Sequence, residues 1–404
     1  MGYYHETGKE IRMKQHYLFR RALAALILCA CVFLLPAFAE DADPSGYMVD
    51  DFPEEQSLAE RTMGRMTLHE KVCQLFFVRP EHFSRLKSVT AYSDRLGKAF
   101  QRFPVGGVIL FDTNITQRNL AALNAGMLQA AQDVNGIGIF IGVDEEGGGV
   151  SRVAKKMKLA EKQPNPESIG SPEEAYASGR TIGGYLSRYG FNLDFAPVAD
   201  VRTDVPNAEI SKRSFGSDPE AVARMTARFT EGLRESGIIP VLKHFPGHGA
   251  VSGNTHTGAG TSLRTREEWE RIDFPPFEAG IQAGSGMVMI SHQLTAAADP
   301  DTPASLSPEV IGLLRNKLGF DGVIITDALR MKAIHGTYTS GESCVLALKA
   351  GADMLLLPYN FTNAYKGVMK AVADGRLTEE RINESVLRIL ALKEEYGLLQ
   401  PERK

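Results

Sequence analysis

Cysteine is scarce in this chain of 404 residues, which contains only Cys29, Cys31, Cys73 and Cys344. The first two lie in an apolar segment near the N-terminus, and the other two are far apart in the sequence. Small secreted domains that depend on disulfides carry more cysteines at closer spacing. We therefore expect no disulfide framework, and we interpret Cys73 and Cys344 as two buried thiols.

A strong net charge is also missing, because 45 Lys and Arg residues face 49 Asp and Glu residues, a formal charge of −4. Without residues 1–39 the chain keeps 40 basic and 47 acidic side chains, a charge of −7. This balance argues against nucleic acid or an anionic membrane as the main partner. Hydrophobic residues make up 43% of the chain, which is typical of a globular protein with a sizeable core.

The apolar run at residues 22–35 is short for a membrane span. Arg20 and Arg21 precede this run, and the small-residue sequence "AFA" at 37–39 follows it. A basic region, a short apolar core and a small-residue site are typical of a secretory signal peptide. We therefore predict an exported protein, located in the periplasm or outside the cell.

This reading divides the chain into a signal peptide (1–39), a polar, acidic linker (40–56) and one catalytic domain (57–404). A lipoprotein signal ending at Cys31 is the alternative, and an uncleaved N-terminal anchor is a second one. Beyond such an anchor we expect no membrane association, and we expect a monomer.

No glycine-rich dinucleotide fingerprint follows any apolar segment, so a nucleotide cofactor is not indicated. Instead, eight short apolar runs alternate with longer amphipathic stretches such as residues 221–237 and 307–319. Continuous rather than alternating hydrophobicity favours strands that are covered on both faces, and eight such units predict an α/β fold, the (β/α)8 TIM barrel. The eight runs are 73–78, 106–111, 137–143, 193–198, 238–243, 286–290, 322–326 and 353–358.

Polar and ionisable residues follow five of these eight runs. In a parallel barrel the carboxyl ends of all strands lie on one face, where barrel enzymes carry their chemistry. We therefore expect these side chains to meet at one rim. They are Asp144 with Glu145, Asp200, Lys243 with His244, Ser291 with His292, and Asp327.

The stretch "KHFPGHGAVSGNTH" (243–256) carries three histidines and no carboxylate. His244 and His248 have the spacing of a helical metal pair, but Pro246 and Gly247 between them break a helix. We therefore predict no metal site. General acid–base chemistry and a glycine-rich loop whose histidines bond to the backbone both remain open on the residues alone.

These segments together resemble glycoside hydrolase family 3. The resemblance lies in "KHFPGHG…TH", "VDEEGG…SR", "LDFAPVADV", "RSFGSDP" and "GVIITDALRM" and covers roughly residues 60–395. The subgroup that the chain resembles is the single-domain bacterial β-N-acetylglucosaminidases. The resemblance implies a barrel, a retaining mechanism, and neither metal nor cofactor.

The resemblance also implies the catalytic residues. Asp327 in "ITDAL" would be the nucleophile, a role that suits an anionic carboxylate held rigidly at a strand end. Taken alone, Asp327 could equally cap a helix. The acid/base would be His256, which the subgroup carries in an Asp-Ser/Thr-His triplet, while His248 would be structural.

In this chain the triplet reads Asn254-Thr255-His256, so the charge that would favour the imidazolium is missing. Asn254 is therefore a catalytic-site position at which the sequence departs from the subgroup. A second departure is Gly149, where the subgroup commonly has arginine. By resemblance, five residues would bind the sugar: Asp144, Arg152, Arg213, Lys243 and His244.

The sequence thus predicts an exported β-N-acetylhexosaminidase acting on peptidoglycan fragments (muropeptides) or small chitin oligosaccharides. Trp269 is the single tryptophan, so a small pocket for terminal sugars is more natural than a long polysaccharide cleft. Three alternatives remain: a family 3 glycosidase of other sugar preference, a phosphorylase, or a sugar-binding protein without turnover.

Overall fold

Eight short parallel strands form the centre of this computed structural model, which describes residues 56–204, 209–252 and 260–400. Their order in the sheet is β12-β10-β7-β6-β3-β2-β1-β13. A parallel bridge between Ile325 and Met354 joins the two outer strands, so the sheet closes on itself. The strands are β1 (Phe76–Val78), β2 (Gly107–Ile109), β3 (Phe140–Val143), β6 (Leu193–Asp194), β7 (Ile239–Phe245), β10 (Met287–Ile290), β12 (Val323–Thr326) and β13 (Leu355–Leu356).

Seven of the eight predicted apolar runs contain one of these strands, and the run 238–243 overlaps β7, which continues to Phe245. The predicted (β/α)8 barrel is confirmed. Apart from β7, the strands are shorter than the runs because the runs extend into turns that are also buried. Parallel strands that are buried on both faces need no polar alternation, which is why the pattern was continuous.

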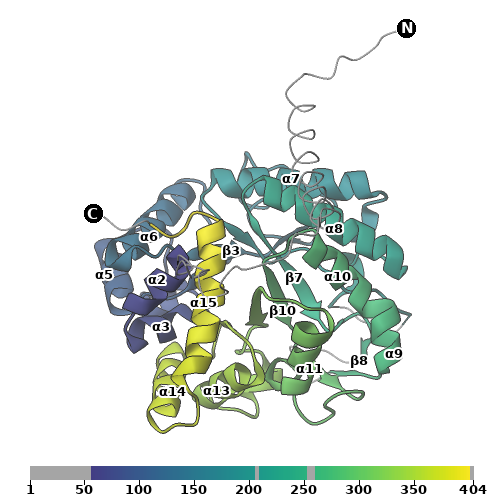
Figure 1. Ribbon diagram of the computed structural model, residues 1–404. Coiled ribbons are helices and arrows are strands. Elements are labelled where there is room, and N and C mark those ends of the chain that lie inside the picture. Colours follow the sequence, from purple (N-terminus) through teal and green to yellow (C-terminus); the bar gives the residue numbers. More distant parts are fainter. Residues whose placement is uncertain (1–55, 205–208, 253–259, 401–404) are drawn as a thin grey trace, which may run out of the picture. The chain divides into compact units, whose positions relative to one another are not determined.

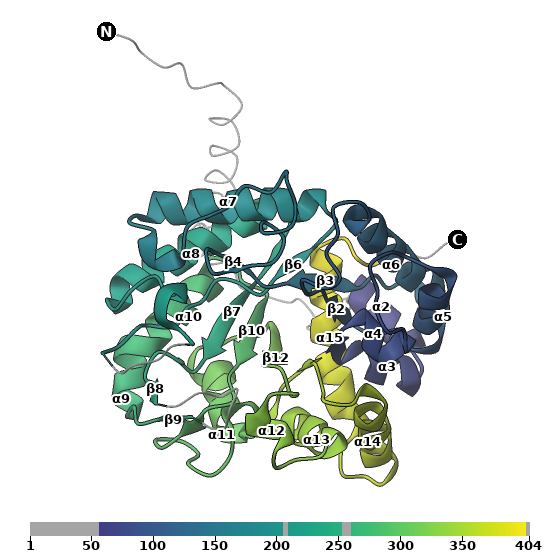
Figure 2. The same cartoon turned by 180° about the vertical axis from the view of Figure 1, so that it is seen from behind.

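Helices surround the strands as an outer ring (Figures 1 and 2). The amphipathic stretch at 221–237 corresponds to α8, and the one at 307–319 to α11 followed by a π-helical turn, Leu313–Lys317. The α-helices between the strands are α4 (Pro80–Ser84), α5 (Asp94–Arg102), α6 (Leu120–Asn135), α7 (Pro172–Arg188), α8 (Pro219–Glu235), α9 (Arg266–Glu268), α10 (Phe274–Gln282), α11 (Pro308–Gly312), α12 (Lys332–His335) and α13 (Ser340–Ala350).

Helices at both ends of the described chain complete the ring. Thr67 and Glu70 form a capping box at the start of α3 (Leu68–Gln74), where each side chain accepts the backbone N–H of the other residue. Helix α2 (Leu58–Arg65) lies beside α15 (Glu379–Glu395), and the backbone N–H of Ala59 donates to Glu394. In both views the purple α2 and the yellow α15 are neighbours, with α14 (Phe361–Ala373) next to them.

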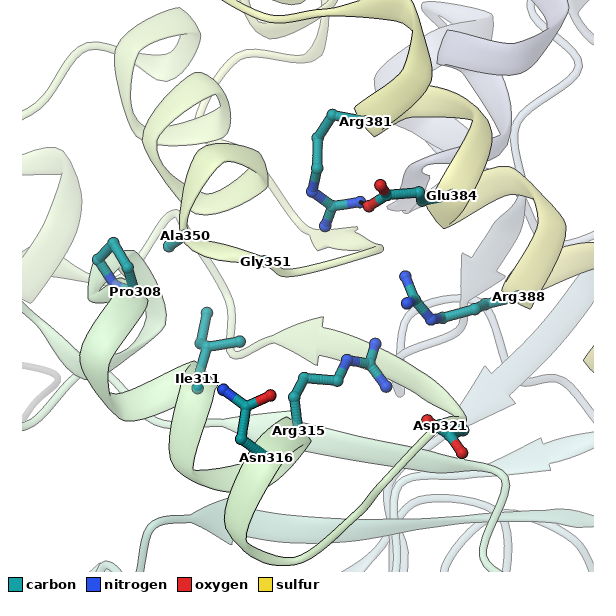
Figure 3. A pocket seen from close by; sticks show the side chains of 11 residues that line it. Pro308, Ile311, Arg315, Asn316, Asp321, Ala350, Gly351, Arg381, Glu384 and Arg388 are labelled. Carbon is teal, nitrogen blue, oxygen red and sulfur yellow. Dashed lines mark ion pairs between the residues drawn. The ribbon is translucent and has the colours of Figure 1, made fainter.

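A buried carboxylate ties β13 to the helices at the amino-terminal end of the barrel. Asp353 accepts hydrogen bonds from the Ile324 N–H (2.9 Å) and the Ser385 hydroxyl (2.8 Å), and it is paired with Arg315. Arg388 approaches the same carboxylate at 3.3 Å. Figure 3 shows Arg315 facing the arginines of α15 across a pocket of about 380 Å³. This network lies at the end of the strands opposite to Asp327.

The remaining expectations about the chain divide into two groups. Cys73 and Cys344 are both free and buried, as predicted, and burial raises the pKa of both thiols. None of the helices within the described residues combines the length and the apolar character that a membrane span requires. The signal peptide at 1–39 and almost all of the linker at 40–56 lie outside the described residues.

Candidate active site

A cavity of about 650 Å³ opens at the carboxyl ends of the barrel strands. It contains six of the eight side chains for which the sequence suggested a catalytic or binding role: Asp327 and the five sugar-binding candidates. Other lining residues come from the segment after β12. The charged and aromatic lining residues are Phe111, Asp144, Glu146, Arg152, Arg213, Lys243, His244, Asp327, Arg330, Lys332 and His335.

A small hairpin after β3 brings Arg152 to Asp144. Its strands are β4 (Glu145–Gly147) and β5 (Val150–Ser151). Gly147 at the end of β4 and Gly148 after it have φ angles of +96° and +51°, which favour glycine. The Arg152 guanidinium then lies 3.2 Å from the Asp144 carboxylate. The "EGGG" sequence is therefore a turn that places an arginine in the cavity, and it is not a phosphate-binding loop.

Glu145 fixes the backbone of this hairpin and of the residues that follow it. Its buried carboxylate accepts the backbone N–H groups of Arg152 (2.6 Å), Val153 (2.7 Å) and Ala154 (3.0 Å) and the hydroxyl of Tyr185 (2.8 Å). Burial raises the pKa of Glu145, and these hydrogen bonds oppose that rise. Glu145 therefore positions Arg152 without lining the cavity.

Glu146 organises the cations of the cavity. Its carboxylate is 2.6 Å from the Lys243 ammonium and accepts two hydrogen bonds from Arg213, at 2.8 and 2.7 Å. Burial opposes its charge, but Arg213 and Lys243 hold its pKa well below the usual range of a glutamate. Lys243 also lies 3.1 Å from Asp144. Burial would lower the pKa of Lys243, yet Glu146 and Asp144 raise it, so the ammonium stays charged.

Asp200 orients the histidine at the end of β7. It accepts the Nδ1–H of His244 at 2.7 Å and the backbone N–H groups of His244 and His248 at 3.2 and 2.6 Å. With Nδ1 used in this way, Nε2 of His244 is turned toward Arg213 at 3.5 Å. Burial raises the pKa of Asp200, but the charge of His244 and its hydrogen bond outweigh this and lower it.

Asp327 follows β12, and its backbone N–H donates to the carbonyl of Ile290. Its side chain accepts the Ala328 N–H at 2.6 Å. Burial disfavours the charged form, but His292, His244, the Ala328 N–H and Lys243 together keep its pKa below the ordinary value. A carboxylate that is ionised, rigidly held and exposed to a cavity has the properties of a nucleophile. It does not cap a helix, because the next one, α12, begins at Lys332.

The similarity to known proteins agrees with this geometry. Residues 67–392 match the glycosyl hydrolase family 3 N terminal domain. The chain belongs to glycoside hydrolase family 3.

Two curated relatives and one solved structure of this family show how the chain compares. It is 30% identical to "Beta-hexosaminidase A" of Pseudoalteromonas piscicida, over 76% of this chain and 56% of that protein. It is 29% identical to "Beta-hexosaminidase LpqI" of Mycobacterium tuberculosis, over 93% of this chain and 97% of that protein. A β-N-acetylglucosaminidase of Paenibacillus sp. superposes with a TM-score of 0.77 at 34% identity, over 84% of this chain and 64% of the other. The family 3 chain therefore spans little more than half of the first relative but nearly all of LpqI.

Two predicted catalytic residues of this family 3 domain, Asn254 and His256, lie outside the described residues. The segment that carries them connects β8 (Val251–Ser252) to β9 (Thr261–Ser262), which pair antiparallel. Strand β9 also pairs with β11 (Leu294–Thr295), just after β10. The two ends of the segment are thus attached beside the carboxyl ends of β7 and β10, and the role of His256 stays a prediction.

Three acidic residues of the site were not predicted as site residues, although all of them stand in segments that carried the resemblance. Glu146 and Glu145 follow Asp144 directly, and Asp200 follows β6. A signal for Glu145 and Asp200 was present, since both were expected at the rim as ionisable residues after an apolar run, but neither was assigned a role. Nothing in the sequence distinguished Glu146 from its neighbours.

The described residues contain no group of three or more histidine, cysteine, aspartate and glutamate side chains arranged to hold a metal ion. His244 and His248 do not form a helical pair, because His244 lies in strand β7 and both residues bond to Asp200.

Proposed function

We propose that this family 3 protein is an exported retaining glycosidase. It removes terminal β-linked N-acetylhexosamine, chiefly N-acetylglucosamine, from peptidoglycan fragments or chitin oligosaccharides. The relatives named beta-hexosaminidase support this activity, most directly LpqI, whose length the chain covers almost completely. The signal-like sequence at residues 1–39 supports export.

The observation that carries the proposal is the ionised Asp327 carboxylate in a cavity rich in hydrogen-bonding groups. Asp327 attacks the anomeric carbon and forms a covalent glycosyl–enzyme intermediate, while His256 donates a proton to the departing oxygen. Water then attacks the same carbon, His256 takes its proton, and Asp327 is released. Both steps pass through an oxocarbenium-like state, which the carboxylate stabilises.

The terminal sugar would be held by the charged groups on the β3, β6 and β7 side of the cavity. Asp144 accepts from sugar hydroxyls, and Arg152, Lys243 and His244 donate to oxygen atoms. Each of these side chains is already oriented by a protein partner, so little conformational entropy is lost on binding. Arg213 contributes directly or through its contact with His244.

The test is release of nitrophenol from the N-acetyl-β-glucosaminide, with and without phosphate, and from the β-glucoside. We expect hydrolysis of the N-acetylated substrate without phosphate. Dependence on phosphate would indicate a phosphorylase, preference for the glucoside a different sugar specificity, and binding without release a sugar-binding protein.

A second experiment addresses the mechanism. Asp327→Ala should abolish hydrolysis while the protein keeps its fold, as judged by circular dichroism. A fluoro-sugar inactivator should label Asp327 covalently. Near-wild-type kcat in Asp327→Ala, or labelling of another residue, would remove Asp327 from the mechanism.

A further inference from the structure

Three arginines gather around one carboxylate at the amino-terminal end of the barrel, opposite the candidate active site. In Figure 3, Arg315 extends from one side of the pocket of about 380 Å³, and Arg381 and Arg388 extend from α15 on the other side. Asp353 is fully buried and is paired with Arg315. The same carboxylate lies 3.3 Å from Arg388 and 3.6 Å from Arg381. A single buried negative charge thus faces three positive charges.

Two of these arginines use most of their other contacts on uncharged acceptors. Arg315 donates to two backbone carbonyls, both at 2.6 Å. Arg381 donates to two backbone carbonyls at 3.0 and 2.9 Å and to the Ser385 hydroxyl at 2.8 Å. These hydrogen bonds fix the guanidinium groups in place without neutralising them. Burial lowers the pKa of Arg315, and although Asp353 opposes this, the charges of Arg388 and Arg381 lower it further.

Arg388 is the arginine with the most unused donors. Within the described residues its only contact is the bond from Nη1 to Asp353 at 3.3 Å, so Nε and Nη2 have no partner there. Its side chain is 31% exposed, against 15% for Arg315 and 18% for Arg381. The exposed amide of Asn316 lines the same pocket. A ligand in this pocket would therefore meet open N–H donors backed by two further cations.

Two carboxylates also line the pocket, and both are exposed. The Glu384 side chain is 58% exposed and lies 3.5 Å from Arg381, and Asp321 is exposed as well. Solvent screens an exposed charge more than a buried one, so these carboxylates reduce the positive potential without cancelling it. The pocket therefore still favours an anion.

We propose that this arginine pocket, formed by Arg315, Arg381 and Arg388, binds a phosphate group, either as inorganic phosphate or as a phosphate monoester. The planar guanidinium fork matches the oxygen atoms of a phosphate, whose several acceptors and up to two negative charges can serve three arginines at once. A carboxylate offers two oxygen atoms and one charge, and it would leave the excess positive charge only partly balanced. A pocket of about 380 Å³ also has room for an organic group attached to the phosphate. The site is separate from the candidate active site, so the inference goes beyond the proposed function and does not depend on it.

The first experiment measures binding of inorganic phosphate by calorimetry and by melting curves, with sodium chloride adjusted to keep the ionic strength constant. Two or three charge-assisted hydrogen bonds should give the wild type a dissociation constant of about 1 mM or below. Because phosphate would bind the folded protein only, the melting temperature should rise with its concentration.

Arg388→Gln is the variant that removes the open donors. Its dissociation constant for phosphate should be about tenfold higher or more. Without phosphate it should stay folded, because Asp353 keeps its pair with Arg315 and its hydrogen bonds from Ser385 and Ile324. The matched control is Arg224→Gln, which removes the same charge from an exposed ion pair with Glu220 on α8 and should bind phosphate as the wild type does.

Glu384→Gln provides a test in the opposite direction. It removes an exposed negative charge from the pocket lining, so it should bind phosphate about threefold more tightly than the wild type. A gain of affinity cannot result from damage to the fold. Unchanged affinity in this variant would show that the phosphate binds elsewhere.

A comparison with glycerol phosphate distinguishes the two sources of the phosphate group. Equal or tighter binding of glycerol phosphate would identify the phosphate of a larger molecule as the ligand, and binding about tenfold weaker would identify the free ion. If the wild type binds neither probe, or if Arg388→Gln binds phosphate as tightly as the wild type, the proposal is wrong. Phosphate bound in the barrel cavity, as in a phosphorylase, would give this second result. None of these measurements uses glycosidase activity, so their outcome is independent of the proposed function.

Discussion

Replacement of Glu146 by glutamine tests the arrangement of the site most directly. The change keeps the shape of the side chain but removes the charge that faces Lys243 and Arg213. The amide oxygen can still accept from one cation, whereas the amide NH2 then points at the other. Lys243 would keep its contact with Asp144 at 3.1 Å, and Arg213 would lose its two hydrogen bonds to the Glu146 carboxylate.

The size of the effect follows from the contacts that are lost. Three charge-assisted hydrogen bonds end on Glu146, two from Arg213 and one from Lys243. Removing one partner of a buried ion pair typically destabilises a protein by about 3–5 kcal/mol. Displacement of Lys243 and Arg213 by about 1 Å would in addition lower kcat/KM about 100-fold.

The assay combines urea unfolding with hydrolysis of the nitrophenyl substrate at a temperature where both proteins stay folded. Glu270→Gln is the matched control, because Glu270 forms an ion pair of 3.0 Å with Lys317 in which both side chains are about half exposed. That pair should contribute about 0–1 kcal/mol. If Glu146→Gln changed stability and kcat/KM no more than Glu270→Gln does, Glu146 would not organise the cations.

The same variant carries a pH prediction. The pKa of Glu146 is depressed in the folded protein, so its contribution is present above the usual glutamate range and is lost as pH falls through the folded pKa. Unfolding free energy of the wild type should therefore fall more steeply in acid than that of Glu146→Gln. If the unfolding free energies of the two proteins fell in parallel as the pH is lowered, the pKa of Glu146 would not be depressed in the folded state.

Three further outcomes are expected. Activity should survive dialysis against EDTA. A loss of activity that zinc restores would refute the prediction that His244 and His248 bind no metal. Asn254→Asp should move the alkaline limb of the kcat–pH profile to higher pH, because a carboxylate raises the pKa of His256. The increase in kcat should be largest for substrates with poor leaving groups. An unchanged alkaline limb would indicate another proton donor. Asp353→Asn should lower the free energy of unfolding by about 3–5 kcal/mol while kcat of the folded protein stays unchanged, since that carboxylate lies at the opposite end of the barrel; altered kcat would refute this separation.

The number of strands and the location of the site could be predicted from the sequence because both depend on the pattern of burial along the chain. A strand covered on both faces must be apolar along its length, so each barrel strand leaves a short, continuous run. Because parallel strands end on the same face, the residue type that follows each run then indicates which side chains meet. Asp144, Lys243, His244 and Asp327 were identified in this way and share one cavity.

The directions in which neighbouring side chains point could not be predicted from the sequence. Asp144, Glu145 and Glu146 are consecutive, yet Asp144 and Glu146 line the cavity while Glu145 holds the backbone of the hairpin beneath it. These directions alternate as they do along any extended chain, but the sequence did not indicate that residues 145–147 form strand β4. It also did not indicate which side of that strand lines the cavity.

The sequence by itself determined the barrel, the family and the segments that bear the chemistry, because burial pattern and motif are properties of contiguous residues. The tertiary structure decided which charges are paired. Asp200 reaches His244 across 44 positions because the chain segments at the ends of β6 and β7 lie side by side, with Val198 bridged to Lys243. Arg330 and Lys332 resemble the other cations of the cavity in the sequence. Yet among the described residues no carboxylate forms an ion pair with either side chain, whereas Arg213 is paired with Glu146, since ion pairing depends on separation in space.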